Sequence, residues 1–164
     1  MDAFHTLAEI AVAIAGFSSL VIIFRGNMSD WNRQDYVSLA FALSWSIGSV
    51  FLSLTPIVLA EFGADLANAA RLGLFGAVTY MLVIGGVLTY ARLQIEAKGG
   101  GHLQFSPALS LLYLLIVVGA LAAGLGLLPG PAHAWFIVTI MLLMAHATAE
   151  LGLFVIQTVR RAPD

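Results

Sequence analysis

The sequence predicts an all-α integral membrane protein whose chain crosses the bilayer in five helices. Of its 164 residues, 60% are hydrophobic and only 10% are charged, and the mean hydropathy is +0.97. Soluble domains carry roughly 25% charged residues, so this chain lacks the polar surface that water requires. Five apolar segments also reach the ~20 residues that a helix needs to cross the hydrocarbon core. We therefore expect one transmembrane domain over residues 1–164.

Short connectors that carry capping and turn residues separate the expected spans. Asp30 is placed to cap the second helix at its N-terminus, and Pro107 follows Ser106 at the first position of the fourth. The connector "LPGPAH" is so short that the last two helices should pack antiparallel. The expected spans cover residues 4–24, 36–60, 66–93, 108–128 and 132–159.

The basic residues predict the orientation of these spans. With five crossings, six of the seven basic residues fall on one side: Arg25, Arg33, Arg92, Lys98, Arg160 and Arg161. Only Arg71 lies on the other side, beside Glu61 and Asp65. Because positive residues are enriched in cytoplasmic loops, we expect the N-terminus outside and the C-terminus in the cytoplasm. The expected location is the plasma membrane of a bacterium, its inner membrane.

Composition and motifs exclude several classes of function. The chain has no cysteine, which removes disulfides and thiolate chemistry. Its net charge of −2 comes without a basic patch, so we expect no nucleic-acid partner. There is no glycine-rich phosphate loop, no metalloprotease motif and no nucleophile elbow. We therefore expect neither an enzyme nor a bound cofactor.

The stretch "MLLMAHATAEL" places a histidine and an acid inside the fifth span. At about 100° per residue, one narrow face of this helix carries a polar strip; it consists of Thr139, His146, Glu150 and Gln157. An ionised carboxylate facing lipid costs several kcal/mol, so Glu150 must face protein, water or a cation. Two interpretations remain. The pair His146 and Glu150 forms a hydrogen bond that holds helices together, or it lines a hydrated path on which His146 titrates near neutral pH.

Further polar residues lie in the first and second spans. Glu9 is about two turns inside the first helix and follows His5 by one turn. Ser46, Ser49 and Ser53 share one face of the second helix. Serines in membrane helices commonly bond to their own backbone, but this row is also a plausible polar lining. Trp45, near the middle of the same helix, requires a partner for its indole N–H or a place facing the polar strip.

These features favour a small homo-oligomeric ion or proton channel, lined by polar residues of the fifth and second helices. Its expected partners are the lipid bilayer, further copies of the chain, and ions or protons. The candidate pore-lining or proton-relay residues are His146, Glu150, Thr139, Gln157, Glu9, Ser46, Ser49 and Ser53. Two alternatives stay open: a non-conducting membrane anchor, sensor or effector subunit, and an intramembrane protein that binds a metal or haem through His and Glu.

Overall fold

The chain folds into a bundle of long helices, described here from a computed structural model that covers residues 2–24, 33–97 and 107–161. Within these ranges every element is helical and there is no strand, which confirms the predicted all-α fold. The helices are α1 (Asp2–Phe24), α2 (Arg33–Glu61), α3 (Leu66–Ala97), α4 (Pro107–Gly124) and α5 (Ala132–Arg161).

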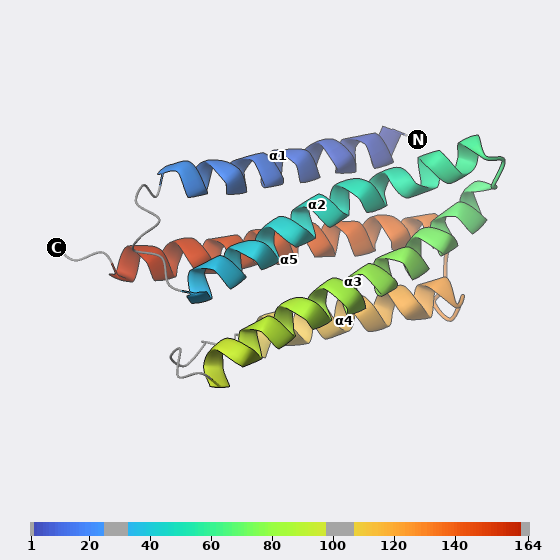
Figure 1. Cartoon of the computed structure of the whole chain (residues 1–164). Helices are drawn as coiled ribbons and strands as arrows, with labels where there is room; N and C mark the ends of the chain where they lie inside the picture. The colour runs from blue at the N-terminus through green and yellow to red at the C-terminus, as the bar shows by residue number, and fades with distance from the viewer. Residues whose placement is uncertain (1, 25–32, 98–106, 162–164) are drawn as a thin grey trace.

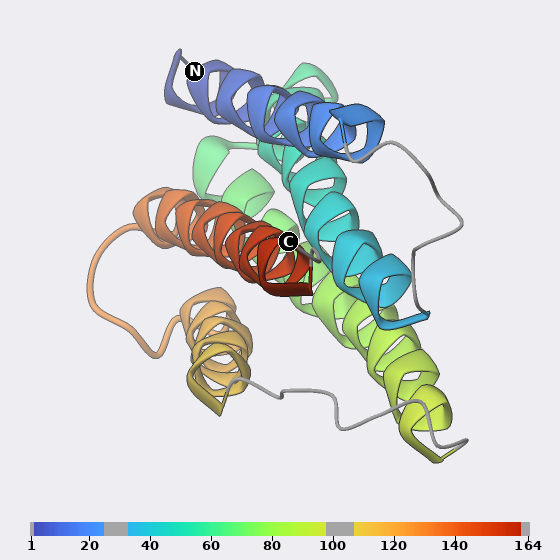
Figure 2. The same ribbon diagram turned by 90° about the vertical axis from the view of Figure 1, so that its left-hand side faces the viewer.

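The helices run lengthwise and alternate in direction, so the bundle has two distinct ends (Figure 1). The N-terminus, the α2–α3 turn and the α4–α5 connection lie at one end, and α5 finishes at the other. Helix α2 is central and packs against α1, α3 and α5. Figure 2 shows α4 at the edge of the bundle, where it packs against α3 and α5.

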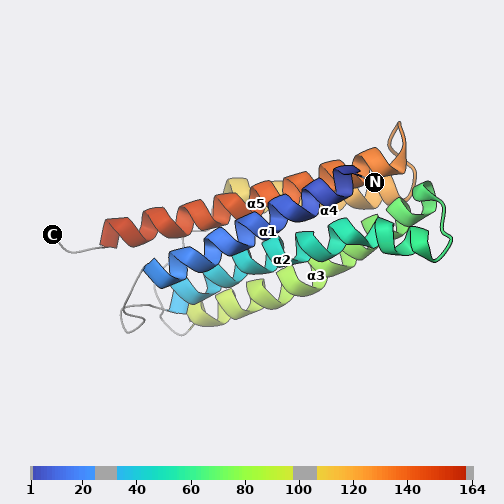
Figure 3. The ribbon, with the colours of Figure 1, turned by 90° about the horizontal axis from the view of Figure 1, so that it is seen from above.

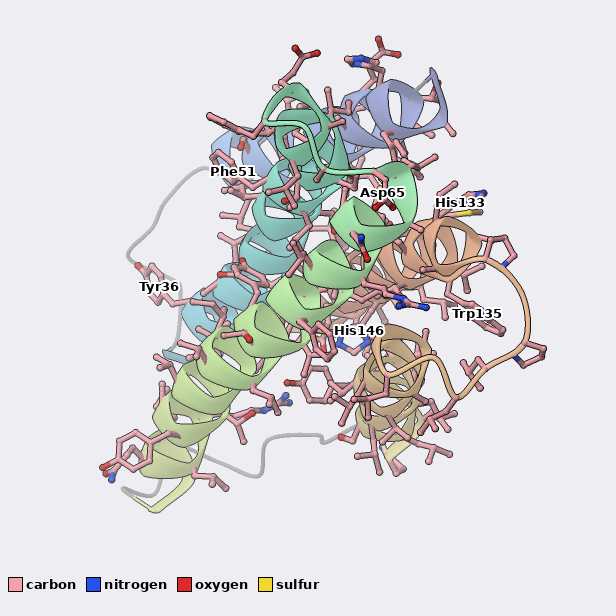
Figure 4. All side chains as sticks on the ribbon, turned by 90° about the vertical axis from the view of Figure 1, so that its right-hand side faces the viewer. Tyr36, Phe51, Asp65, His133, Trp135 and His146 are labelled. Atoms are coloured by element: carbon pink, nitrogen blue, oxygen red, sulfur yellow. The ribbon has the colours of Figure 1, made fainter. Side chains whose placement is uncertain are left out.

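Four of the described helices are long and apolar enough to cross a membrane, namely α2, α3, α4 and α5. Helix α1 has 23 residues, and its described part contains a shorter apolar stretch, Ala3–Phe17. Large apolar side chains point outward; Phe51, which is labelled in Figure 4, is 71% exposed. An outer surface of this kind is suited to lipid, since soluble proteins rarely expose extended apolar patches.

The fourth helix ends earlier than the predicted span, which extended to residue 128. Helix α4 stops at Gly124 because Gly126 adopts a positive φ of 74°. The N–H groups of Gly126 and Leu127 then donate to the carbonyls of Ala123 and Ala122, at 3.0 and 2.9 Å. A left-handed glycine with backward bonds of this kind is a common helix stop. Apolar composition continues past this point, so hydropathy alone placed the end too late.

The α2–α3 turn is built from a glycine and a capping acid. Gly63 has a φ of +87°, a conformation that side chains disfavour. Asp65 precedes α3 and accepts a hydrogen bond from the backbone N–H of Asn68 at 2.9 Å. This bond lowers the pKa of the Asp65 carboxyl, because it stabilises the charged form. Asp65 is therefore the N-cap of α3.

Candidate functional site

The most unusual polar group of the bundle is His146, which lies in its interior. Figure 4, viewed from the end with the α2–α3 turn, shows it between α3 and α4. The residue is 3% exposed. Its Nε2 is 4.0 Å from Oε1 of Glu150, whose side chain is 12% exposed. This separation is too long for the direct hydrogen bond that one of the two interpretations of the pair requires.

A cation on a second helix acts on the acid of this pair. Arg92 is near the C-terminal end of α3, is partly buried, and is close enough for its positive charge to act on Glu150. In the sequence, Arg92 served only as a marker of the expected cytoplasmic side. In the fold it connects α3 electrostatically with the polar strip of α5.

The rings of Trp45 and Tyr113 lie beside the imidazole of His146, and we call them the aromatic shell. The rings of Trp45 on α2 and Tyr113 on α4 each have centroids 6.2 Å from that of His146. Trp45 is fully buried and meets the imidazole edge to face, at 73°. Its position beside the polar strip confirms one of the two options expected for it. Within the described part of the chain, Nε1 of Trp45 and Nδ1 of His146 are buried without a hydrogen-bond partner.

Two tyrosines support the aromatic shell in the same way: each donates to a backbone carbonyl of a neighbouring helix and lies over a glycine of that helix. Tyr113 donates to the carbonyl of Met81 at 2.6 Å and lies over Gly85, where a methyl group would collide with its ring. In the same way Tyr80 donates to the carbonyl of Ser44 at 2.5 Å.

The second tyrosine lies over Gly48, again four residues beyond the carbonyl that it binds. A glycine at that position leaves the carbonyl one turn earlier accessible to a neighbouring helix, since a helical side chain leans toward the N-terminus. Neither tyrosine is among the residues that the sequence pattern singled out. A tyrosine in mid-span, matched by a glycine in another span, was the available signal.

The hydroxyl groups of the second helix are satisfied by their own backbone. Ser46, Ser49 and Ser53 are fully buried and donate to the carbonyls four residues earlier, at 2.8, 2.8 and 2.6 Å. Thr139, the first member of the polar strip, donates to the carbonyl of Trp135 at 2.9 Å. All four side chains face neighbouring helices inside one protomer, so none lies on the outer surface.

The remaining two candidate residues do not join His146. Glu9 is exposed on the outer surface of α1, as is His5. The side chain of Gln157 lies outside the described residues. Among the described side chains, no group of three or more His, Cys, Asp or Glu residues is arranged to hold a metal ion. The structure therefore brings together His146, Glu150, Arg92, Trp45 and Tyr113.

Comparison with known proteins gives no assignment by similarity. No family model, no curated protein and no solved structure matches this chain. The function is therefore inferred from the geometry of the site.

Proposed function

We propose that this chain is a bacterial inner-membrane protein that moves protons or small cations through a homo-oligomer. In this proposal all five helices cross the bilayer, with the N-terminus outside and the C-terminus in the cytoplasm. The observation that carries it is the pair His146 and Glu150, sheltered inside an otherwise apolar bundle. Ionisable groups inside membrane spans are costly, and they commonly mark ion or proton pathways.

The chemistry of the pair suits proton transfer. A proton that leaves the Glu150 carboxyl for Nε2 of His146 produces a carboxylate and an imidazolium, which attract each other. At 4.0 Å the transfer requires a small rotation of either side chain or one bridging water. The charge of Arg92 attracts the carboxylate, and the rings of Trp45 and Tyr113 lie about as far from the imidazolium as cation–π contacts reach.

Most of the candidate pore-lining residues of α2 and α5 are buried, so the proposed proton route differs from the pore lining that the sequence suggested. A path along α2 and α5 runs between the helices of each protomer, because Ser46, Ser49, Ser53, Thr139 and His146 are all buried there. Side chains of this kind do not reach an axis shared between copies unless the helices rearrange. Each protomer of the oligomer then carries its own relay.

A non-conducting membrane subunit is the second candidate, and a specific observation favours it. The serine and threonine hydroxyls donate to their own helices, so helix packing alone accounts for their burial. Phe136, Ile140 and Leu143, on the same helix as Thr139 and His146, are fully buried apolar residues. In this case the polar pair specifies how helices pack.

Proton flux into liposomes separates the two functions. If the pair relays protons, Glu150→Gln and His146→Gln each lower the flux at least about tenfold, since positioned proton-transfer groups typically contribute 10²–10⁴. Glu61→Gln and His133→Gln are matched controls, because Glu61 is exposed at the last residue of α2 and His133 is only half-buried near the start of α5. Both controls should conduct as the parent does.

Two results contradict conduction through this pair. One is a parent protein that conducts no more than empty liposomes, which favours the non-conducting subunit. The other is undiminished flux in Glu150→Gln and His146→Gln.

A further inference from the structure

One exposed face of α1 combines an acid, an imidazole and small residues. We call it the α1 outer face; it consists of His5, Glu9, Ala13, Gly16 and Leu20. Their spacing of three or four residues places them on one side of the helix. All five are exposed in the protomer, and a methyl group added at Gly16 would meet nothing within 4 Å.

The contact between Phe4 and Phe136 sets the depth of this face. The two rings have centroids 5.9 Å apart, and α1 and α5 run in the same direction (Figure 1). Glu9 follows Phe4 by five residues, so it is level with about residue 141 of α5. The apolar part of α5, Ala132–Ile156, has its middle near residue 144. At 1.5 Å per residue, Glu9 is within about 5 Å of mid-span.

The start of α1 supports this depth. Figures 1 and 3 show that α1 begins short of the end of α2, which packs against it. Glu9 and His5 therefore lie below the rim of the bundle, on a surface that faces lipid in a lone protomer. A carboxylate at such a depth is costly unless protein covers it.

We infer that a second copy of this chain covers the α1 outer face, with α1 packed against α1. In a symmetric pair whose axis runs along the membrane normal, the two helices are parallel and each contact occurs twice. A parallel two-fold pair sets each residue level with its own copy, and Glu9 of each copy then pairs with His5 of the other across an axial offset of one turn, about 6 Å. Ala13 and Gly16 allow the backbones to approach closely below these pairs.

The contact follows from charge complementarity. The acid and the base lie on one strip at adjacent turns, so two copies of this strip bring an acid and an imidazole together twice. The inference depends on the membrane insertion and self-association in the proposed function, and it is independent of conduction.

Cysteine crosslinking tests this contact, since the chain contains no native cysteine. Gly16→Cys should form disulfide-linked dimers in native membranes treated with copper phenanthroline. Gly86→Cys on α3 and Gly119→Cys on α4 are matched controls, because these glycines have equally open surroundings. We expect the dimer yield of Gly16→Cys to exceed both controls at least about fivefold. Equal yields at the three positions, or a Gly16→Cys adduct with a different protein, would overturn the inference.

The charged pair is tested in the same background. Glu9→Leu and His5→Leu, each combined with Gly16→Cys, should lower the dimer yield, with helicity checked by circular dichroism. An unchanged yield in both folded variants removes the pair from the interface. Glu150→Gln with Gly16→Cys should crosslink as strongly as Gly16→Cys alone. A Gly16→Cys protein that crosslinks but conducts no more than empty liposomes counts against conduction only, and one that conducts without crosslinking counts against this interface only.

Discussion

Gly85→Ala tests the packing that holds the aromatic shell around His146. The added methyl group would collide with the Tyr113 ring, whose hydroxyl oxygen is its nearest neighbour, and would also press on Trp45. Tyr113 has to move, and its hydrogen bond to the Met81 carbonyl is lost. Gly86 is the control on the same helix, because an added methyl group there meets nothing within 4 Å.

The magnitude follows from three contributions to the free energy of unfolding. Overpacking a filled core costs about 1–3 kcal/mol, and the lost hydrogen bond costs about 1 kcal/mol. Replacing glycine by alanine inside a helix returns about 1 kcal/mol. Gly85→Ala should therefore destabilise the protein by roughly 1–3 kcal/mol, whereas Gly86→Ala should be neutral or stabilising by up to about 1 kcal/mol.

Unfolding by SDS in mixed micelles, followed by circular dichroism, measures both variants. Adding Tyr113→Phe to Gly85→Ala removes the oxygen atom nearest to the new methyl group, so the double variant should recover part of the loss. Such non-additivity is expected of residues in contact. Equal stability of Gly85→Ala and Gly86→Ala would refute the reasoning.

Two further predictions concern the serine row and the α3 cap. Ser49→Ala should change the free energy of unfolding by less than about 1 kcal/mol in the same assay, because the Ser49 hydroxyl bonds only within α2; a larger loss would indicate a partner on another helix. Asp65→Ala should lower the thermal midpoint at neutral pH. The Asn68 hydrogen bond lowers the pKa of Asp65, so its stabilising contribution is present above the ordinary carboxyl pKa and is lost as pH falls through the lowered one. The difference from the parent should vanish in strong acid, and a constant difference would exclude this origin.

Which segments form long apolar helices could be predicted from the sequence, because the length of an apolar segment is a local property. The four long spans needed no knowledge of neighbours. The cap at Asp65 was not predicted, although an aspartate directly before the helix was a local signal for it. The end of α4 depended on the positive φ of Gly126, which hydropathy does not report.

The two His-x-x-x-Glu pairs illustrate what local pattern leaves open. His5 with Glu9 and His146 with Glu150 have the same spacing on apolar helices. The first pair is exposed and the second is enclosed. The difference arises from the neighbouring helices, since α5 packs against all of the others while α1 packs only against α2 and α5. No periodicity within one helix carries that information.

The aromatic shell was unpredictable for the same reason. Trp45 and Tyr113 come from helices distant in sequence, and their rings meet only because α2, α4 and α5 converge. A mid-span tryptophan did signal a special environment. The identity of its neighbours required the fold.

The central claim is that α5 is embedded in lipid with its polar strip turned inward. The most direct test is to place spin labels along α5 and to measure how often they collide with oxygen and with a water-soluble nickel complex. Labels at Met141, Ala145 and Thr148, which are exposed in the protomer, should collide often with lipid-dissolved oxygen and rarely with nickel in bilayers. Labels at Leu143 and Ala147, which are fully buried, should collide rarely with both. Frequent nickel collisions at the three exposed positions would place α5 in water and contradict the account.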